Sequence, residues 1–296
     1  MIRTAILFNP HSGRGQKEEE IKRIVERYGE AVFLIPFEKS ENIDEAVKTA
    51  SEHGVATIIA VGGDGTVSSV ASAIVRLKLP LRLGVVPSGT FNHFAKDIGI
   101  PLEMEKAFEI ALSGQTKLVD IAAVNDIYFI NNSSLGIYPE IVKEREGLEK
   151  KGLSKKKAFL VTLYSVFKKL PKITISFDAG NSSISKKTSF IFIGNNKYSL
   201  DGLAIGSRNN LDQGILSVFM AHNIGKFEML SLGIKAALGN IAEEKSFDTA
   251  GLRECIIKIT PPEILVSHDG EISRMKGPLK YKIHSLALQV IIPSHL

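Results

Sequence analysis

The chain has 296 residues, enough for about two domains with a hydrophobic core in each. Hydrophobic residues make up 44% of the chain and charged residues 23%, which excludes a disordered or fibrous protein. The 37 basic and 32 acidic residues give a net charge of +5, a modest excess whose meaning depends on its distribution.

The first part of the chain alternates short β-rich runs with amphipathic helical stretches. We predict strands at residues 4–8, 32–35, 57–61 and 83–86, and helices at residues 17–28 and 43–50. Such alternation is typical of a parallel sheet with helices on both faces. We therefore predict an α/β nucleotide-binding domain over residues 1–121.

After about Leu118 the pattern changes to strands with few helices between them. The strand-like runs are residues 119–124, 127–131, 172–177, 189–194, 215–221, 256–260, 264–266 and 286–292, with helical segments at 143–170 and 226–238. This pattern favours an antiparallel sandwich or barrel. We predict an all-β sandwich acceptor domain over residues 122–296, whose last residues are candidates for packing back on the first domain.

Three glycine-rich elements each follow a predicted strand of the first domain. They are residues 9–15, 62–66 and 87–92. In a parallel sheet, loops that follow strands meet at one edge, where ligands bind. The first element, taken alone, is equally well read as a tight turn before a helix, because glycine and asparagine mark turns generally.

The second element, Gly-Gly-Asp-Gly-Thr, is the most specific of the three. Gly62, Gly63 and Gly65 let the backbone approach an anion closely, and a helix from about Thr66 presents free N–H groups to it. A carboxylate at Asp64 would repel a bare phosphate, so it makes most sense acting through Mg²⁺ on a nucleotide polyphosphate. The chain contains neither a P-loop motif nor a complete dinucleotide fingerprint.

Three motifs then stand in order: Asn-Pro-x-Ser-Gly from Asn9, the Gly-Gly-Asp-Gly-Thr loop, and Pro-Ser-Gly-Thr-x-Asn-x-Phe-Ala at 87–95. With them the chain resembles the diacylglycerol kinase catalytic family, which includes bacterial lipid kinases and sphingosine kinases and is distantly related to NAD kinases. The likeness continues through Asp120 and residues 131–136, 195–214 and 269–271, so it covers nearly the whole chain. It implies an ATP site in the cleft between an α/β domain and a β-sandwich domain, with transfer of the γ-phosphate to a lipid hydroxyl.

The resemblance also implies roles for individual residues. The residues implied in ATP binding are Asn9, Ser12, Gly62, Gly63, Asp64, Gly65, Thr66, Ser88, Gly89, Thr90 and Asn92. Asp64 and Asp120 would belong to a Mg²⁺ and water network. Asp269 and Glu271 resemble the acidic pair beside the acceptor, with Asp64 as the third catalytic acid. From the residues alone, Asp269-Gly270 between two strands is a hairpin turn.

Two positions depart from the family pattern. His93 stands where many members have an aspartate, and Asp97, four residues on and on the same helical face, could supply the missing carboxylate to the metal or be an exposed helix residue. Gln213 replaces an acidic ligand of a structural Mg²⁺, and a neutral amide is a weaker ligand for that cation. We therefore do not expect that structural metal here.

The basic excess is concentrated in one segment. Residues 143–172 carry ten basic and three acidic side chains, a net of +7, and the rest of the chain has a net of −2. Apolar residues recur in this segment at helical spacing, so it is either a basic amphipathic helix on an anionic membrane or a helix packed on the sandwich with a solvated lysine rim.

A single cysteine, Cys255, cannot form an intrachain disulfide and fits a reducing compartment, where we expect it to be a small buried hydrophobe. Residues 1–7 do not have the pattern of a signal peptide, and no run reaches the roughly 18 apolar residues of a membrane span. We expect a cytoplasmic protein with peripheral membrane contact.

The leading hypothesis is an ATP- and Mg²⁺-dependent lipid kinase at the membrane surface. The alternatives are an NAD kinase type of enzyme and an ATP-binding, membrane-associated module without catalysis. The expected partners are a lipid substrate and an anionic membrane surface, a homodimer stays open, and nucleic acid is not expected because the basic stretch carries no recognition motif.

Overall fold

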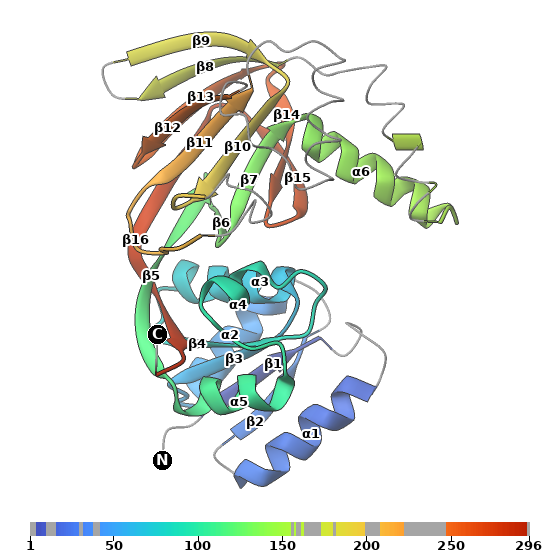
Figure 1. Ribbon diagram of the computed structural model, residues 1–296, viewed down its shortest axis with the longest axis vertical. Helices are drawn as coiled ribbons and strands as arrows, with labels where there is room; N and C mark the ends of the chain where they lie inside the picture. The colour runs from blue at the N-terminus through green and yellow to red at the C-terminus, as the bar shows by residue number, and fades with distance from the viewer. Residues whose placement is uncertain are drawn as a thin grey trace. The chain divides into compact units, whose positions relative to one another are not determined.

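The computed structural model describes residues 4–9, 16–29, 32–37, 42–154, 157, 161–162, 173–179, 182–198, 208–221 and 247–294. The chain divides into two compact units (Figure 1). Unit 1 comprises residues 1–121, 128–130 and 284–296, and unit 2 comprises residues 122–127 and 131–283. Strands β5 (Gln115–Val124) and β16 (Leu279–Ile292) contribute residues to both units.

Unit 1 is built on a parallel sheet of apolar strands. Its order is β2 (Val32–Pro36), β1 (Thr4–Phe8), β3 (Thr57–Gly62) and β4 (Arg82–Pro87), and the end of β16 pairs in parallel with β4. All residues of β1 and β3 are buried. Strands buried on both faces are typical of a parallel sheet with helices on each side, as the sequence predicted.

Five helices accompany these strands in the described part of unit 1: α1 (Gln16–Tyr28), α2 (Ile43–Glu52), α3 (Asp64–Arg76), α4 (His93–Asp97) and α5 (Met104–Ser113). Helices α2 and α3 pack against each other. An exposed ion pair of 3.0 Å between Arg27 and Glu105 joins α1 to α5. The strands β1, β2 and β3 are each followed by a helix that leads to the next parallel strand, as parallel strands require.

Unit 2 contains a six-stranded antiparallel sheet and the antiparallel part of a ten-stranded sheet that also includes the parallel strands of unit 1. The six-stranded sheet has the order β12 (Phe247–Leu252), β11 (Leu216–Ala221), β10 (Phe190–Asn195), β7 (Asn132–Gly136), β14 (Glu263–His268) and β15 (Glu271–Lys276). In the other, the start of β16 pairs with β13 (Glu254–Thr260), which pairs with β8 (Ile173–Ala179), and β8 pairs with β9 (Ser182–Thr188).

A buried hydrogen bond connects these two sheets. The hydroxyl groups of Ser133 on β7 and Tyr281 on β16 lie 3.0 Å apart, and Tyr281 is fully buried. Burial raises the pKa of Tyr281 well above its ordinary value, so the phenol stays neutral at any physiological pH. The two sheets therefore face each other, and the predicted fold class, a parallel α/β part followed by an all-β sandwich, is confirmed.

The helical segment predicted over residues 143–170 begins earlier than predicted and is interrupted, although residues 157, 161 and 162 are again helical. Helix α6 spans Ile137–Lys150 and is followed by a turn at Lys151 and Gly152. Gly152 has a φ of +91°, and the N–H of Leu153 donates to the carbonyl of Leu148 at 3.1 Å. This is the Schellman arrangement, in which a left-handed glycine ends a helix. Most of residues 155–172 and the predicted helix at 226–238 lie outside the described residues.

Within the described ranges, no helix is both long enough and apolar enough to cross a membrane. Cys255 is buried with 2% of its surface exposed, and burial raises the pKa of its thiol to about 12. The cysteine is therefore the small core residue that the sequence predicted, without the thiolate character that a reactive thiol needs.

Candidate active site

The ends of three parallel strands lie at one edge of the sheet in unit 1. Phe8 of β1 is in register with Val61 of β3, and Gly62 of β3 is in register with Pro87 of β4. Half-buried Asn9 therefore follows β1 beside the loops that follow β3 and β4. The structure brings Asn9 and the loops after β3 and β4 to one edge, while residues 10–15, Ser12 among them, lie outside the described residues.

The loops after β3 and β4 touch through their glycines. The N–H of Ser88 donates to the carbonyl of Gly62 at 2.8 Å. A Cβ atom on Gly89 would lie only 2.5 Å from the Cα of Gly63, and a Cβ on Gly63 would lie 3.2 Å from the Cα of Gly89. Backbone packs directly on backbone here, which any larger residue at position 89 would prevent.

Helix α3 begins at this contact with its N–H groups uncapped by a side chain. Gly63 is the N-cap residue and makes no side-chain capping bond, and the N–H of Val67 donates to its carbonyl at 3.1 Å. The N–H groups before Val67 have no partner within the helix. A Cβ on Gly65 would meet no atom within 4 Å, so the helix terminus opens onto free space. This is the geometry of an anion site, with the positive end of the helix dipole directed at it.

Gly62, the first glycine of the loop, leaves room for the side chain of a neighbouring residue. A Cβ on Gly62 would lie 2.4 Å from the Cβ of Thr66, so the absence of a side chain at residue 62 gives Thr66 its place. Thr66 is half-buried in the first turn of α3. Gly62 and Gly63 thus allow close packing with Thr66 and Gly89, whereas a Cβ at Gly65 would contact no atom of the protein.

Asn92 shapes the loop after β4. Its backbone is left-handed, with φ +52°. Its side-chain oxygen accepts a hydrogen bond from the N–H of Gly89 at 3.0 Å, and its side-chain nitrogen donates to the carbonyl of the same glycine at 3.0 Å. Asparagine tolerates this backbone conformation better than other non-glycine residues. Asn92 is buried and therefore organises the loop, while Ser88 is half-buried and Thr90 is exposed.

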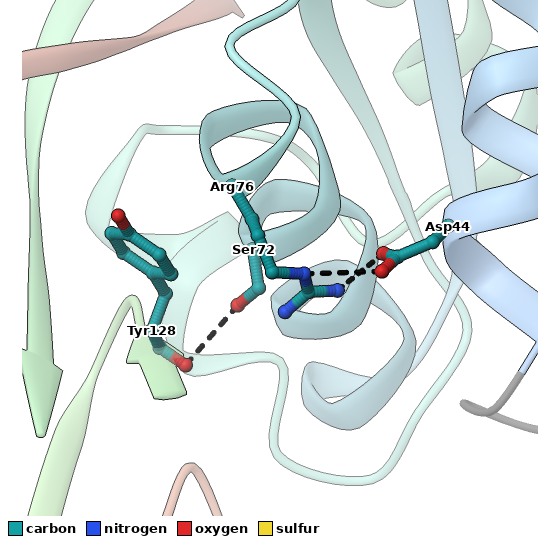
Figure 2. Close-up of polar contacts among 4 residues, drawn as sticks. All are labelled: Asp44, Ser72, Arg76 and Tyr128. Atoms are coloured by element: carbon teal, nitrogen blue, oxygen red, sulfur yellow. Dashed lines mark hydrogen bonds and ion pairs between the residues drawn. The ribbon is translucent and has the colours of Figure 1, made fainter. Parts of the chain in front are cut away.

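Two contacts at the far end of α3 fix the helix that carries the loop (Figure 2). The Ser72 hydroxyl donates to the carbonyl of Tyr128 at 3.1 Å, and Arg76 pairs with Asp44 of α2 through two hydrogen bonds. Both contacts lie within unit 1. The N-terminus of α3 is therefore presented by a helix held to α2 and to β6 (Ile127–Phe129).

The three predicted metal ligands occupy different surroundings. Asp64 is the first residue of α3, and its Oδ1 accepts a weak bond of 3.4 Å from the N–H of Phe94 in α4. Asp97 is the half-buried last residue of α4. Asp120 of β5 is 1% exposed, and its Oδ1 accepts a 2.8 Å bond from the N–H of Leu286.

The structure does not gather these carboxylates into one metal cage. Leu286 has a left-handed φ of +52°, so Asp120 is engaged in holding an irregular point of β16. Across the residues that the structure describes, no group of three or more His, Cys, Asp or Glu side chains could hold a metal ion. A Mg²⁺ ion that keeps waters and binds phosphates with one protein carboxylate still fits Asp64.

In unit 2, Asp269 stands in the tight turn between β14 and β15. Asp269 and Gly270 both have positive φ, +47° and +88°, as in a two-residue type I′ hairpin. The Oδ1 atom of Asp269 accepts hydrogen bonds from the N–H groups of Asn131 at 2.8 Å and Asn132 at 3.0 Å. The N–H of Asp269 donates to the carbonyl of Asn132 at 2.9 Å, which anchors the turn to the start of β7.

Two neighbours of the turn are titratable. Glu271 is exposed at the start of β15, opposite His268 at the end of β14. His268 is 8% exposed, and its Nε2 lies 2.9 Å from the Ser273 hydroxyl. Burial lowers the pKa of His268, although the charges of Glu271 and Asp269 oppose this shift. The imidazole is therefore mainly neutral at pH 7.

A buried arginine, which we did not predict from the sequence, braces the same region. Arg208 is 3% exposed, and its guanidinium donates to Asn131 Oδ1 at 2.8 Å and to the carbonyl of Asn195 at 3.0 Å. It also lies 5.3 Å from the centre of the Tyr198 ring. Because the backbone of Asn131 holds Asp269, Arg208 supports the acidic turn through one intervening residue.

The segment that contains Gln213 is closed by amide groups. The N–H of Gln213 donates to Asn196 Oδ1 at 2.9 Å, and its own Oε1 accepts from the N–H of Lys197 at 3.2 Å. Asn196 is fully buried with φ +69°. The side chain of Gln213 is thus used as a hydrogen-bond acceptor for the backbone.

Comparison with known proteins finds relatives for the first part of the chain. Residues 3–124 match the model of the diacylglycerol kinase catalytic domain. A diacylglycerol kinase of Bacillus subtilis (strain 168) is 33% identical over 145 residues, covering 48% of this chain and 48% of the relative. A protein of Yersinia pestis (strain Pestoides F) named "Probable lipid kinase YegS-like" is 35% identical over 142 residues, covering 47% and 48%. The chain spans about half of the length of these curated relatives.

The fold extends the likeness to the rest of the chain. A crystal structure described as a diacylglycerol kinase from Bacillus anthracis str. Sterne superposes with a TM-score of 0.73 at 21% identity, covering 98% of this chain and 96% of the other. At this identity the similarity shows the shared architecture of both units. The resemblance predicted from the three motifs is confirmed over residues 3–124, which contain all three motifs and match the model of the diacylglycerol kinase catalytic domain.

Proposed function

We propose that this chain is an ATP-dependent kinase that transfers the γ-phosphate to a hydroxyl group of a lipid. The observation that carries the proposal is the uncapped N-terminus of α3, where Gly65 leaves open space beside the contact between Gly63 and Gly89. Backbone N–H groups that have no partner within their own helix suit a polyphosphate. The relatives named as lipid kinases support a lipid as the acceptor.

In this proposal the nucleotide is bound by the loops at the sheet edge, through Asn9, Ser12, residues 62–66, Ser88, Gly89, Thr90 and Asn92. Asp64, at the first position of α3, would share a Mg²⁺ ion with the phosphates. When bound, Mg²⁺ supplies charge neutralisation for the transferring phosphoryl group. In this proposal the loop backbone positions the phosphates, and the glycines keep side chains out of the space that the phosphates occupy.

Asp269 and Glu271 would serve the acceptor. In the reaction, a bond forms between the γ-phosphorus and the acceptor oxygen, the bond to the bridging oxygen breaks, and ADP leaves. The hydroxyl proton passes to one of the two carboxylates. The backbone N–H groups of Asn131 and Asn132 fix the orientation of Asp269, and phosphoryl transfer needs only a weak base.

The membrane surface is part of the same proposal. Segment 143–172 has a net charge of +7, and Lys143, Lys151 and Lys157 are exposed in its described part. Each such cation near anionic headgroups contributes about 1 kcal/mol. Replacing Lys155, Lys156 and Lys157 together by Glu should weaken binding to anionic vesicles in a salt-dependent way, and unchanged binding would favour a solvated lysine rim. Lys155 and Lys156 lie outside the described residues.

The test of the function is a transfer assay. Labelled ATP and Mg²⁺ are incubated with the protein and with diacylglycerols, sphingoid bases and phospholipids in mixed micelles, and one lipid fraction should become labelled. Asp64→Ala should abolish transfer without unfolding the protein, while Asp126→Ala, which changes an exposed acid in the β5–β6 turn, should keep it. Bound ATP without transfer to any lipid would contradict the proposal, and near-normal transfer by Asp64→Ala would contradict the site.

A further inference from the structure

Two buried serines on neighbouring strands of unit 2 have hydroxyl groups without a hydrogen-bond partner. Ser134 of β7 and Ser267 of β14 are 2% and 1% exposed, and the part of the chain that the structure describes offers no partner to either Oγ atom. Buried hydroxyl groups almost always find a partner, because an unpaired one has lost its hydration without compensation. This pair therefore calls for a physical explanation.

The two serines lie directly opposite each other. Ser267 is in register with Ser134, so both side chains project from the same face of the six-stranded sheet. The preceding residue on β7, Ser133, contacts Tyr281 in the other sheet. Because successive side chains of a strand point to opposite faces, Ser134 projects away from the sandwich interior. The pair is thus a local polar spot on the outer face of this sheet.

The surroundings of the spot are apolar. Phe192 of β10 stands opposite Ser134, and Ile272 of β15 stands opposite Ser267. The Phe192 ring makes an edge contact of 5.2 Å between ring centres with Tyr198. Helix α6 packs against β7, β14 and β15, with Ile137 against Phe190 on the same sheet face. Two unpaired hydroxyls set in an aromatic and aliphatic frame have the composition of a ligand subsite for an apolar molecule with one polar group.

The spot is also close to the acidic turn. Ser267 precedes Asp269 by two residues, and Ser134 follows Asn132, whose N–H holds Asp269, by two residues. Two residues along a strand span about 7 Å. A glycerolipid whose free hydroxyl lies near Asp269 could bring an ester carbonyl of the same molecule within reach of the serines.

We infer that Ser134 and Ser267 form a subsite that donates hydrogen bonds to a carbonyl oxygen of the acceptor lipid. The subsite deepens the proposed lipid phosphorylation and rests on it for the identity of the ligand. Its consequence is selectivity: an ester-linked acceptor satisfies the buried hydroxyls, whereas an ether-linked analogue of the same length leaves them unpaired.

The free protein provides the first readout. Ser134→Ala and Ser267→Ala remove an unpaired hydroxyl from a buried apolar site, so the melting temperature should stay the same or rise. Ser133→Ala is the matched control on the adjacent position of β7, because it removes the bond to Tyr281 and should lower the melting temperature. A fall in stability in both serine variants, equal to that of Ser133→Ala, would show that the pair has a structural role and would overturn the subsite.

The second readout uses dioctanoylglycerol and its dioctyl ether as probes. The diester should raise the melting temperature of the wild type more than the diether does, and kcat/KM should favour the diester by about tenfold, a preference that both Ala variants lose. An equal response of wild type and variants to the two probes would overturn the subsite. If the diester shifts the melting temperature selectively and no lipid is phosphorylated, the proposed function fails and the subsite stands.

Discussion

The loops that follow β3 and β4 in unit 1 and the acidic turn of unit 2 are built in opposite ways. In the loops, backbone contacts backbone: Gly63 and Gly89 touch directly, and Gly65 faces open space. The turn is held by side-chain hydrogen bonds. Arg208 donates to the side chain of Asn131, and the backbone N–H of Asn131 donates to the carboxylate of Asp269. The first kind of site fails when an atom is added, and the second fails when an atom is removed.

The largest effect should come from removing the buried guanidinium. Arg208→Met leaves Asn131 Oδ1 and the carbonyl of Asn195 without this donor, and each unsatisfied buried acceptor costs about 1–3 kcal/mol. We expect the free energy of unfolding to fall by about 2–5 kcal/mol and kcat to fall more than the KM for ATP rises. Urea unfolding and steady-state kinetics measure the two effects.

Arg208→Lys is the informative companion of that variant. Lysine keeps the charge but loses the planar fork and the stacking on Tyr198, so it should recover only part of the stability and of kcat. Full recovery by lysine would mean that the charge alone matters and would contradict the bracing geometry.

Gly89→Ala should have the next largest effect. The added methyl would lie 2.5 Å from the Cα of Gly63, and backbone on both sides leaves no flexible side chain to move away. Overpacking of this kind costs about 1–3 kcal/mol of stability. Because the loops must separate to relieve it, we also expect weaker binding of an ATP analogue, and a loss of the same size in binding free energy is about 5- to 150-fold in affinity. Isothermal titration calorimetry measures the loss, and an unchanged Kd would contradict the direct contact of the two loops.

The same contrast explains what the sequence could predict. The loops were predictable because three glycine-rich elements each follow an apolar strand, and strands such as β1 and β3 stand out by their composition. The turn at Asp269 was predictable as an Asp-Gly hairpin. Arg208 was not, because 77 residues separate it from Asn131 and only the folded chain brings them together.

The elements that we did not predict from the sequence also have physical reasons. Strands β7 and β9 are rich in serine, lysine and threonine, so they carry no apolar signal and are strands because their neighbours pair with them. The end of α6 could have been predicted, since a glycine within a helical pattern is a stop signal, and Gly152 is left-handed. The contact between the Asp120 carboxylate and the backbone of β16 could not be predicted either, because 166 residues separate Asp120 from Leu286.

Gly65→Ala should separate binding from stability in the loops. A Cβ at residue 65 meets no protein atom within 4 Å, and alanine is a better helix former than glycine. The free energy of unfolding should stay the same or rise by up to about 1 kcal/mol, while the methyl group fills space that a phosphate would use. Differential scanning calorimetry and ATP-analogue binding check both parts, and unchanged binding would mean that no phosphate approaches this glycine.

The smallest effect should be a pH dependence of stability at the acidic turn. Burial lowers the pKa of His268 below its ordinary value of 6.5, with Glu271 and Asp269 partly opposing the shift. As the pH falls below about 6.5, the unfolded chain takes up a proton that the folded chain binds less readily, so stability falls on acidification.

The variant His268→Gln tests this effect, because glutamine can still form a hydrogen bond with Ser273 but does not titrate. Between pH 7.5 and 5 the wild type should lose more unfolding free energy than His268→Gln, by less than about 1 kcal/mol. Equal losses would show that His268 is as easily protonated in the folded protein as in the unfolded chain.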